Sequence, residues 1–527
     1  MKQLFSFLCS LFVLHSEIFS QELFNRFYSR DSGYYHFNSH VIKNDKIYVL
    51  AQFNDDRVRE IYASTAIITF DMKGNIIQVD TIMPRGKDVL LFFSTSIRYV
   101  NDSTLFFISA DTSQTYAVYY NLNSHDLIYS KIKPHPLSKD KFFYSYPYGL
   151  ELGYKNFIFV TNEWLGRLRK VGMGNYKTGD LVLTKLCNDS LVKNIIISAG
   201  DFDLYKDGIF LNKNNNIYIY GLLSDDAVNE QEDYTYRQMI MEFDTSLNII
   251  RKIFSPDDLK LGNIYKIIEG QNGDLFCASS KLTLKRFPFG TNVEQGHRAI
   301  SKYNSNGDYL WSKVFTYPVG FSPNTFEGIC FNKDSTSVVA VGSLCEAIRV
   351  DSVIVNIPCK GVIANISLNG DSLWQRLYSV RGKDSESWEE FFDIKNSPDG
   401  GYLVSGSSRS DESNDPYAYQ SGWLMKIDEH GCYIPGCHLV NVVNSPIEFE
   451  VKIYPNPSTD YFTILHGFHL PLDLSVYNLN GTLMCRYHEL NSLETCFIPT
   501  ENFAKGIYNI VLSRNGKILK FANLQKF

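Results

Sequence analysis

The chain has 527 residues, of which 44% are hydrophobic and 20% charged, and its formal net charge is −6. This length predicts more than one domain, and the composition is typical of a packed, water-soluble protein. No basic run is present, so nucleic acid is excluded as an expected partner. Aromatic residues make up 14%, a level that favours β-strands over helices.

The first twenty residues predict a secretory signal peptide. A basic Lys2 precedes an apolar stretch from Leu4 to Leu14, and the small Ser20 stands before the expected cleavage point. The stretch is too short to serve as an anchor, and no later run is long and apolar enough to cross a bilayer. We therefore expect an exported mature chain with no transmembrane segment.

Residues 22–29, "ELFNRFYS", form the first predicted strand of the mature chain. They resemble residues 372–379, "SLWQRLYS", which end a repeat unit far along the sequence. The seventh repeat unit runs into "EHGCYIPGC" without a fourth strand of its own. We predict that residues 22–29 pair with residues 421–428 and close a ring, which removes an open sheet edge.

Seven repeat units follow between residues 21 and 445. In each, an apolar strand ending in small residues leads through a variable loop to an alternating strand, a tight turn and another strand. The apolar strands fall near residues 50, 109, 161, 221, 278, 342 and 406, and a further strand precedes each of them. Trp311 and Trp374 occupy matching offsets. This pattern predicts an all-β fold, a seven-bladed β-propeller. An elongated solenoid is the alternative.

The tight turns carry the residues that hairpins require. Gly, Asn or Asp recurs in "MKGN" (72–75), "SNGD" (305–308), "LNGD" (368–371) and "DEHG" (428–431). These residue types accept the positive φ of a short hairpin loop. The turns therefore predict antiparallel pairing of the strands on either side.

Nine cysteines remain after the predicted cleavage, so at least one of them is unpaired. Export permits disulfides, and the turn-rich "GCYIPGC" favours a bond between Cys432 and Cys437. Other pairs close in sequence are Cys345 with Cys359 and Cys485 with Cys496. The alternative is that several cysteines are small buried hydrophobic residues. No cysteine or histidine spacing indicates a metal site.

Residues 446–527 depart from the repeat. Short alternating strands and two Asn-Gly turns, at 480–481 and 515–516, predict a small β-sandwich of about seven strands. The expected organisation is a signal peptide at 1–20, a propeller at 21–445 and this sandwich at 446–527.

Three segments of that region resemble a known family. "YPNPSTDYFTI" (454–464), "LSVYNLNGTLM" (474–484) and "KGIYNIVLSRNGKILKF" (505–521) are similar, in order, to the C-terminal sorting domain of type IX secretion cargo in Bacteroidetes. The resemblance implies the type IX secretion machinery as partner, passage through the periplasm, and release or attachment at the outer-membrane surface. It also implies a sorting signal at Tyr454, Pro455, Asn456, Pro457, Gly506, Tyr508, Gly516, Lys517 and Lys520. The repeats "SPDGGYLVSGSS" and "GWLMKIDEHGC" resemble, more loosely, those of exported Bacteroidetes proteins and imply no activity.

The sequence contains no motif for catalysis or for a cofactor. It lacks G-x-S-x-G, H-E-x-x-H and a phosphate-binding loop, so no cofactor is expected. The nearest candidates for a channel or ligand site are Glu327, Glu389 and Glu390, on strands expected to line the propeller channel. Carboxylates there suit a cation or a sugar, whereas their matching repeat positions favour a structural role.

We therefore expect a non-catalytic binding or scaffold module for an unknown protein or glycan ligand. A secreted hydrolase or lyase acting on polysaccharide or peptide through those acids is the alternative. A scaffold within the cell-surface layer is a third possibility.

Overall fold

The computed structural model describes residues 23–28, 33–55, 64–82, 96–110, 115–132, 147–152, 157–171, 174–187, 190–197, 203–224, 236–286, 292–315, 324–345, 348–350, 353–356, 359–379, 387–410, 421–433, 451–454, 458–466, 472–478, 482–490, 496–514 and 517–526. Within these residues the chain is all-β, apart from a 3-10 turn at Asp257–Leu259. No helix among them is long and apolar enough to cross a membrane. The chain divides into two bodies, Met1–Cys437 and His438–Phe527.

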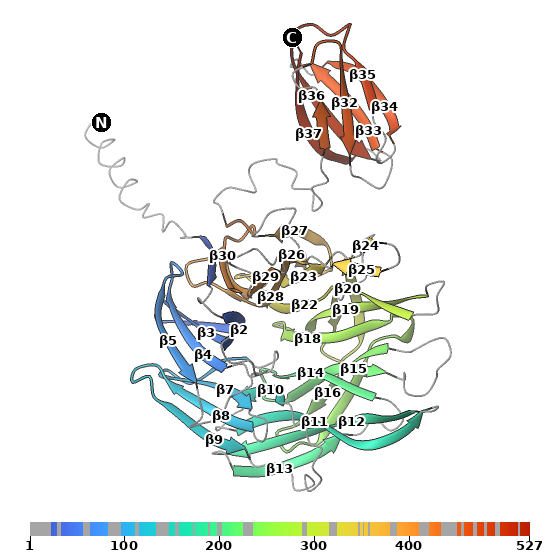
Figure 1. Cartoon of the computed structure of the whole chain (residues 1–527). Coiled ribbons are helices and arrows are strands. Elements are labelled where there is room, and N and C mark those ends of the chain that lie inside the picture. Colours follow the sequence, from blue (N-terminus) through green and yellow to red (C-terminus); the bar gives the residue numbers. More distant parts are fainter. Residues whose placement is uncertain are drawn as a thin grey trace, which may run out of the picture. The chain divides into compact units, whose positions relative to one another are not determined.

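The described strands of the N-terminal body form four-stranded antiparallel sets, which we number as repeat units in chain order (Figure 1). Units 1 to 3 are β2 (Gly33–Lys43), β3 (Lys46–Asp55), β4 (Ser64–Asp71) and β5 (Ile76–Ile82); β6 (Arg98–Asn101), β7 (Thr104–Ala110), β8 (Thr115–Asn121) and β9 (Leu127–Ile132); and β10 (Pro147–Leu152), β11 (Phe157–Val171), β12 (Gly174–Cys187) and β13 (Ser190–Ile197). Units 4 and 5 are β14 (Asp203–Leu211), β15 (Ile217–Ser224), β16 (Tyr236–Phe243) and β17 (Ile249–Phe254); and β18 (Leu261–Glu269), β19 (Leu275–Arg286), β20 (Asn292–Tyr303) and β21 (Tyr309–Phe315).

Units 6 and 7 belong to one eight-stranded sheet, joined by a single parallel bridge between Cys359 and Trp388. Their strands are β22 (Phe326–Phe331), β23 (Ser337–Cys345), β26 (Cys359–Ser367) and β27 (Ser372–Tyr378); and β28 (Ser387–Asn396), β29 (Tyr402–Ser410), β30 (Ser421–Ile427) and β1 (Phe24–Tyr28). A hairpin of β24 (Ile348–Val350) and β25 (Val353–Asn356) is inserted in unit 6. The Cys345–Cys359 disulfide joins the two strands from which the hairpin emerges.

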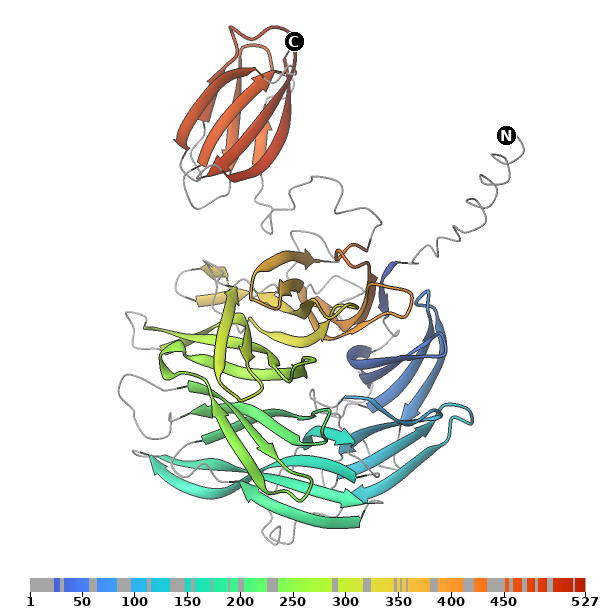
Figure 2. The same cartoon turned by 180° about the vertical axis from the view of Figure 1, so that it is seen from behind.

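The units succeed one another around a common centre, with β2, β18 and β28 among the strands nearest to it (Figures 1 and 2). Apolar side chains of neighbouring units share cores, so both faces of a sheet are covered, and all nine residues of β23 are buried. The last unit packs against the first, because Leu403 and Leu424 join Phe37 and Phe70 in one cluster. This arrangement is that of a β-propeller-like fold.

The strand at the front of the chain pairs as its sequence predicts. β1 runs antiparallel to β30, from Phe24 opposite Lys426 to Tyr28 opposite Gly422. The indole N–H of Trp423 donates to Asn25 Oδ1 across this pair at 2.6 Å. The predicted pairing of residues 22–29 with residues 421–428 is thereby confirmed for the residues that the structure describes.

The turn between the third and fourth strands has a recurring chemistry. In unit 1, Asp71 Oδ1 accepts hydrogen bonds from the backbone N–H of Lys73 and of Asn75, at 2.9 and 2.7 Å. Equivalent residues also accept backbone N–H groups in units 2, 4, 5, 6 and 7, although the second donor in unit 2 lies three residues on: Asn121, Asp244, Asn304, Ser367 and Asp428. The polar turns predicted from sequence are therefore side-chain-capped hairpins.

The fourth strand of a unit packs on the turn of the next unit. A Cβ added to Gly431, the turn glycine of unit 7, would lie 2.8 Å from the Trp374 ring of unit 6. A Cβ added to Gly74 of unit 1 would lie 2.9 Å from the Phe24 ring of β1. β1 therefore meets unit 1 as β27 meets unit 7.

The C-terminal body contains two sheets. One has the order β31 (Val451–Tyr454), β32 (Tyr461–His466) and β35 (Cys496–Pro499), and the other β34 (Leu483–Leu490), β33 (Leu472–Asn478), β36 (Gly506–Arg514) and β37 (Lys517–Lys526). Both contribute to one core, which includes Phe462 and Ile498 from the first sheet and Val476 and Ile510 from the second.

Candidate functional site

The inner strands of the N-terminal body carry a repeated irregularity. Strands β2, β10, β14, β18, β22 and β28 each insert an extra residue relative to the neighbouring strand: Asn38, Tyr148, Asp207, Tyr265, Glu327 and Phe392, respectively. A β-bulge re-aims side chains and strengthens local twist. Of the candidate acids, Glu327 is itself a bulge residue, whereas Glu389 and Glu390 precede the bulge residue of β28.

Two of the three predicted acids come together. Glu327 is the bulge residue of β22, and its Oε1 accepts from the Thr325 hydroxyl at 3.2 Å. Glu390 lies on the neighbouring inner strand β28 and accepts a hydrogen bond from the Trp388 side chain. Both glutamates are partly buried. The site thus joins units 6 and 7.

The electrostatics of this pair are those of two acids competing for ionisation. Burial, and then the charge of Glu390, raise the pKa of Glu327 to about 8. Burial also raises the pKa of Glu390. Like charges at one place disfavour double ionisation, so near neutral pH Glu327 keeps a proton and can donate a hydrogen bond.

The third predicted acid, Glu389, does not join them. Successive side chains of a strand point to opposite faces, and Glu389 is fully buried while Trp388 and Glu390 are partly exposed. The expected trio is therefore a pair with one separate residue.

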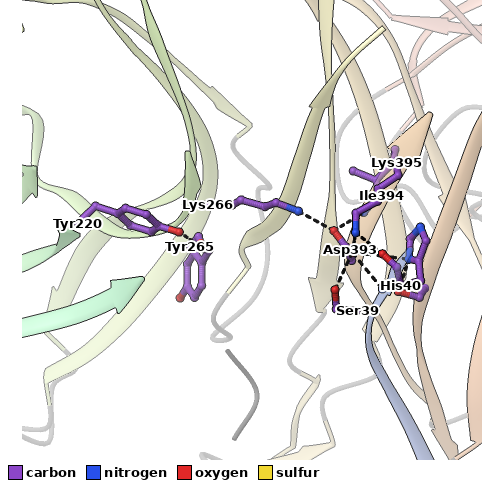
Figure 3. Close-up of polar contacts among 9 residues, drawn as sticks. Ser39, His40, Tyr220, Tyr265, Lys266, Asp393, Ile394 and Lys395 are labelled. Atoms are coloured by element: carbon purple, nitrogen blue, oxygen red, sulfur yellow. Dashed lines mark hydrogen bonds and ion pairs between the residues drawn. The ribbon is translucent and has the colours of Figure 1, made fainter. Parts of the chain in front are cut away.

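A second polar cluster lies further along β28 (Figure 3). The Asp393 carboxylate, which is 3% exposed, accepts from Lys266 Nζ of β18 at 2.5 Å. Its Oδ2 accepts from Ser39 Oγ at 3.1 Å and from the backbone N–H of His40 at 3.3 Å, both on β2. Lys395 Nζ lies 3.3 Å from the same oxygen. The Asp393 carboxylate therefore contacts hydrogen-bond donors and ammonium groups from units 1, 5 and 7.

The charges of this cluster follow from burial and from the lysines. Burial alone would raise the pKa of Asp393, but Lys266 and Lys395 hold that pKa well below its usual range. Burial lowers the pKa of Lys395 to about 8, with Lys266 acting in the same direction. Burial also lowers the pKa of His40 to about 3, so that ring is neutral at physiological pH.

Sequence reasoning missed this cluster because its members are far apart in the chain and form no motif. A signal was present: Ser39, Lys266 and Asp393 each follow the bulge residue of their inner strand. In units 3, 4 and 6 glycine occupies this position: Gly149, Gly208 and Gly328. A residue-level alignment of the units would have revealed the opposite charges.

The cysteines follow one of the alternative pairings. Cys345 and Cys359 are disulfide-bonded. Cys432 is also disulfide-bonded, but its predicted partner Cys437 lies outside the described residues, so that pairing stays a prediction. No group of residues suited to holding a metal ion occurs in the described part of the chain.

The predicted sorting residues lie on three strands of the C-terminal body. Tyr454 ends β31, while Lys517 and Lys520 lie on β37. Gly506 begins β36, on which the buried Tyr508 donates its hydroxyl to the Ala504 carbonyl at 2.7 Å. The remaining predicted sorting residues are outside the described part of the chain: Pro455, Asn456, Pro457 and Gly516.

Comparison with known proteins assigns the end of the chain. Residues 452–522 match the family described as the secretion system C-terminal sorting domain. No curated protein matches the chain.

Solved structures similar to the chain include the Neurospora crassa Pan2 WD40 domain, at 8% identity and a TM-score of 0.40, covering 75% of this chain and 90% of that one. Another is the Pseudomonas aeruginosa periplasmic gluconolactonase PpgL, at 10% identity and a TM-score of 0.40, covering 70% and 94%. A third is a DUF4221 family member from Bacteroides vulgatus, at 11% identity and a TM-score of 0.32, covering 54% and 99%.

Proposed function

We propose a ligand-binding role for this protein, whose residues 452–522 are a secretion system C-terminal sorting domain that directs export through the type IX secretion system to the cell surface or the medium. The proposed binding module is the N-terminal body. Its proposed site is the carboxyl pair of Glu327 and Glu390, and the role is binding or scaffolding without catalysis.

The pairing of these two glutamates carries the proposal. Two partly buried carboxyls that disfavour each other's ionisation destabilise the folded state. Groups with pKa values perturbed in this way concentrate at functional sites. Within the described residues, no lysine, arginine or histidine forms an ion pair with either one. The protonated Glu327 offers a donor, a carboxyl oxygen of Glu390 offers an acceptor, and the Trp388 ring offers an apolar face to a ligand.

We further propose that the N-terminal body is a closed, seven-bladed β-propeller whose last blade is completed by β1. The pairing of β1 with β30 and the packing of unit 7 on unit 1 support this. In this proposal the boundaries are those expected from sequence, with a signal peptide at 1–20, the propeller at 21–445 and a β-sandwich at 446–527.

A binding screen against glycans and secreted proteins tests the ligand proposal. The chain is compared with Glu327→Gln and Glu390→Gln, which keep side-chain size and remove the titrating groups. We expect at least a tenfold loss of affinity for the ligand in both variants. Binding that is unchanged in both would move the site away from the inner strands.

The second candidate is a secreted hydrolase or lyase, and the raised pKa of Glu327 favours it. A carboxyl that keeps its proton near neutral pH can act as a general acid beside an ionised partner. Turnover of polysaccharide or peptide substrates that is lost in Glu327→Gln, with a pH profile falling as Glu327 ionises, would establish this reading. Binding without turnover would exclude it.

A further inference from the structure

The boundary between units 7 and 1 joins parts of the chain that are remote in sequence. On its outer side, β1 pairs with β30 and sets the Phe24 ring on the turn of unit 1. In its middle, Phe37 and Phe70 of unit 1 pack with Leu403 and Leu424 of unit 7. The inner side of the boundary is polar, and it is where Asp393 lies.

Asp393 makes its contacts across that boundary. Both of its donors from unit 1, the Ser39 hydroxyl and the His40 backbone N–H, belong to β2, while Asp393 belongs to β28. Lys395 adds a second link in the opposite direction, because its ammonium donates to the His40 carbonyl. Hydrogen bonds to an ionised group are stronger than neutral ones.

Asp393 also binds a lysine from unit 5, which is not next to unit 7 in chain order. Lys266 lies on β18 of unit 5, and its ammonium bonds Asp393 of unit 7 although unit 6 stands between them in chain order (Figure 3). Gly328 of β22 lies in close contact with β28: a Cβ there would be 3.0 Å from the Phe392 carbonyl and 3.2 Å from Asp393 Cα. Lys266 therefore ties unit 7 to a unit that it does not adjoin in chain order.

We propose that Asp393 is the centre of an inner clasp, formed with Ser39, His40, Lys266 and Lys395, that holds the first and last units together independently of β1. The clasp rests on the closed ring proposed above and gives it a second closure. The two closures act at opposite sides of one boundary. The boundary opens locally only when both are weakened.

Hydrogen exchange in the full chain tests the clasp. Phe27→Ala weakens the outer closure, because the Phe27 ring lies 5.3 Å from that of Trp423. Lys266→Met removes the ammonium that most compensates for the burial of Asp393, the carboxylate that accepts from Ser39 and His40 across the boundary. Exchange is followed at β2 and β30, with β16 of unit 4 as the internal reference. The control is Lys302→Met, which breaks the 3.0 Å ion pair with Asp274 of unit 5 and a 3.3 Å hydrogen bond to the Leu368 carbonyl of unit 6, both outside the boundary between units 7 and 1.

We expect each single variant to leave β2 as protected as β16. The double variant Phe27→Ala, Lys266→Met should speed exchange at β2 and β30 at least tenfold relative to β16, while Phe27→Ala, Lys302→Met should not. Ser39→Ala, which removes one hydrogen bond and no charge, is the milder replacement if the lysine variant does not fold.

Two results would overturn the clasp. One is a β2 strand already exposed by Phe27→Ala alone, and the other is a double variant as protected as the single ones. A failure of the ring proposal itself looks different: in that case Phe27→Ala would leave exchange in β1 and β30 unchanged.

Discussion

Single side chains of the inner strands decide how this protein responds to pH. Burial and mutual repulsion disfavour ionisation of both Glu327 and Glu390. The pKa of Glu327 is raised to about 8, so this side chain stays protonated at neutral pH. Asp393 is the opposite case, since Lys266 and Lys395 more than compensate for its burial. Carboxyls on the neighbouring inner strands β22 and β28 therefore contribute to stability with opposite signs.

The pH dependence of stability follows from the raised pKa of Glu327. Between the usual glutamate range and pH 8, the folded state binds more protons than the unfolded state, so the free energy of unfolding falls as pH rises. The slope from one group is at most about 1.4 kcal/mol per pH unit. Urea unfolding at pH 5, 6, 7 and 8 should show Glu327→Gln gaining stability over the natural chain as pH increases. The exposed Glu501→Gln is the control, and parallel profiles for Glu327→Gln and the natural chain would refute the prediction.

A second residue-scale prediction concerns the turn glycines. Gly370 has a φ of +94°, and a Cβ there would lie 3.2 Å from the Trp311 ring. Gly400 has a φ of +102° with nothing within 4 Å of such a Cβ. Gly400→Ala should therefore lose only the backbone strain, about 1–2 kcal/mol, and Gly370→Ala should lose more. Equal losses in urea unfolding would mean that the tryptophan contact adds nothing.

At the scale of elements, β1 behaves as the fourth strand of unit 7. Tyr28 of β1 donates its hydroxyl to the Gly74 carbonyl of unit 1. Tyr378, at the matching place in β27, donates to the Gly431 carbonyl of unit 7 at 2.5 Å. The resemblance between "ELFNRFYS" and "SLWQRLYS" thus extends to the hydrogen bonds that the two strands make.

This equivalence predicts that removing either tyrosine hydroxyl lowers the free energy of unfolding by a similar amount. Tyr28→Phe and Tyr378→Phe each remove one hydrogen bond to a carbonyl, and each should lower the free energy of unfolding by about 1 kcal/mol. Thermal or urea unfolding measures both, and Tyr433→Phe, at a side chain that is 41% exposed, serves as the control. If Tyr28→Phe were neutral while Tyr378→Phe destabilised, β1 would not be held in solution as β27 is.

Local patterns predicted most of the N-terminal body. The turn residues, the apolar second strands and the copied strand at residues 22–29 all encode short-range geometry, which the sequence displays directly. The sequence grouped Glu327, Glu389 and Glu390 by repeat position. In the structure, however, Glu327 is equivalent to Phe392, the bulge residue of β28, and strand alternation turns Glu389 to the face opposite Glu390. The Asp393 cluster escaped prediction because it depends on three inner strands from different units coming together, and only an alignment of the units at their β-bulges displays the charged positions.

At the scale of the whole molecule, the sorting domain and the candidate ligand site belong to different bodies. Residues 452–522 are the sorting domain, and the N-terminal body holds the candidate ligand site. The two bodies also have separate hydrophobic cores. Removing one should therefore leave the other folded.

Deleting residues 447–527 should strand the protein in the periplasm, because the sorting domain is the part that the type IX machinery recognises. Fractionation of the producing cells, with immunodetection of the N-terminal body, measures this. The truncated protein should keep the Cys345–Cys359 disulfide and the thermal transition of the N-terminal body. A truncated protein that reached the medium would contradict the sorting assignment.

The position of β1, far in sequence from its partner β30, also affects the order in which strands can pair during folding. The Asn25–Trp423 hydrogen bond spans 398 residues, so β1 cannot pair until one of the last strands of the N-terminal body is in place. Contacts of such long range form slowly, and both β1 and the edge of β30 stay open until they meet. Until they pair, these two unpaired edges are the part of the N-terminal body most open to aggregation and proteolysis.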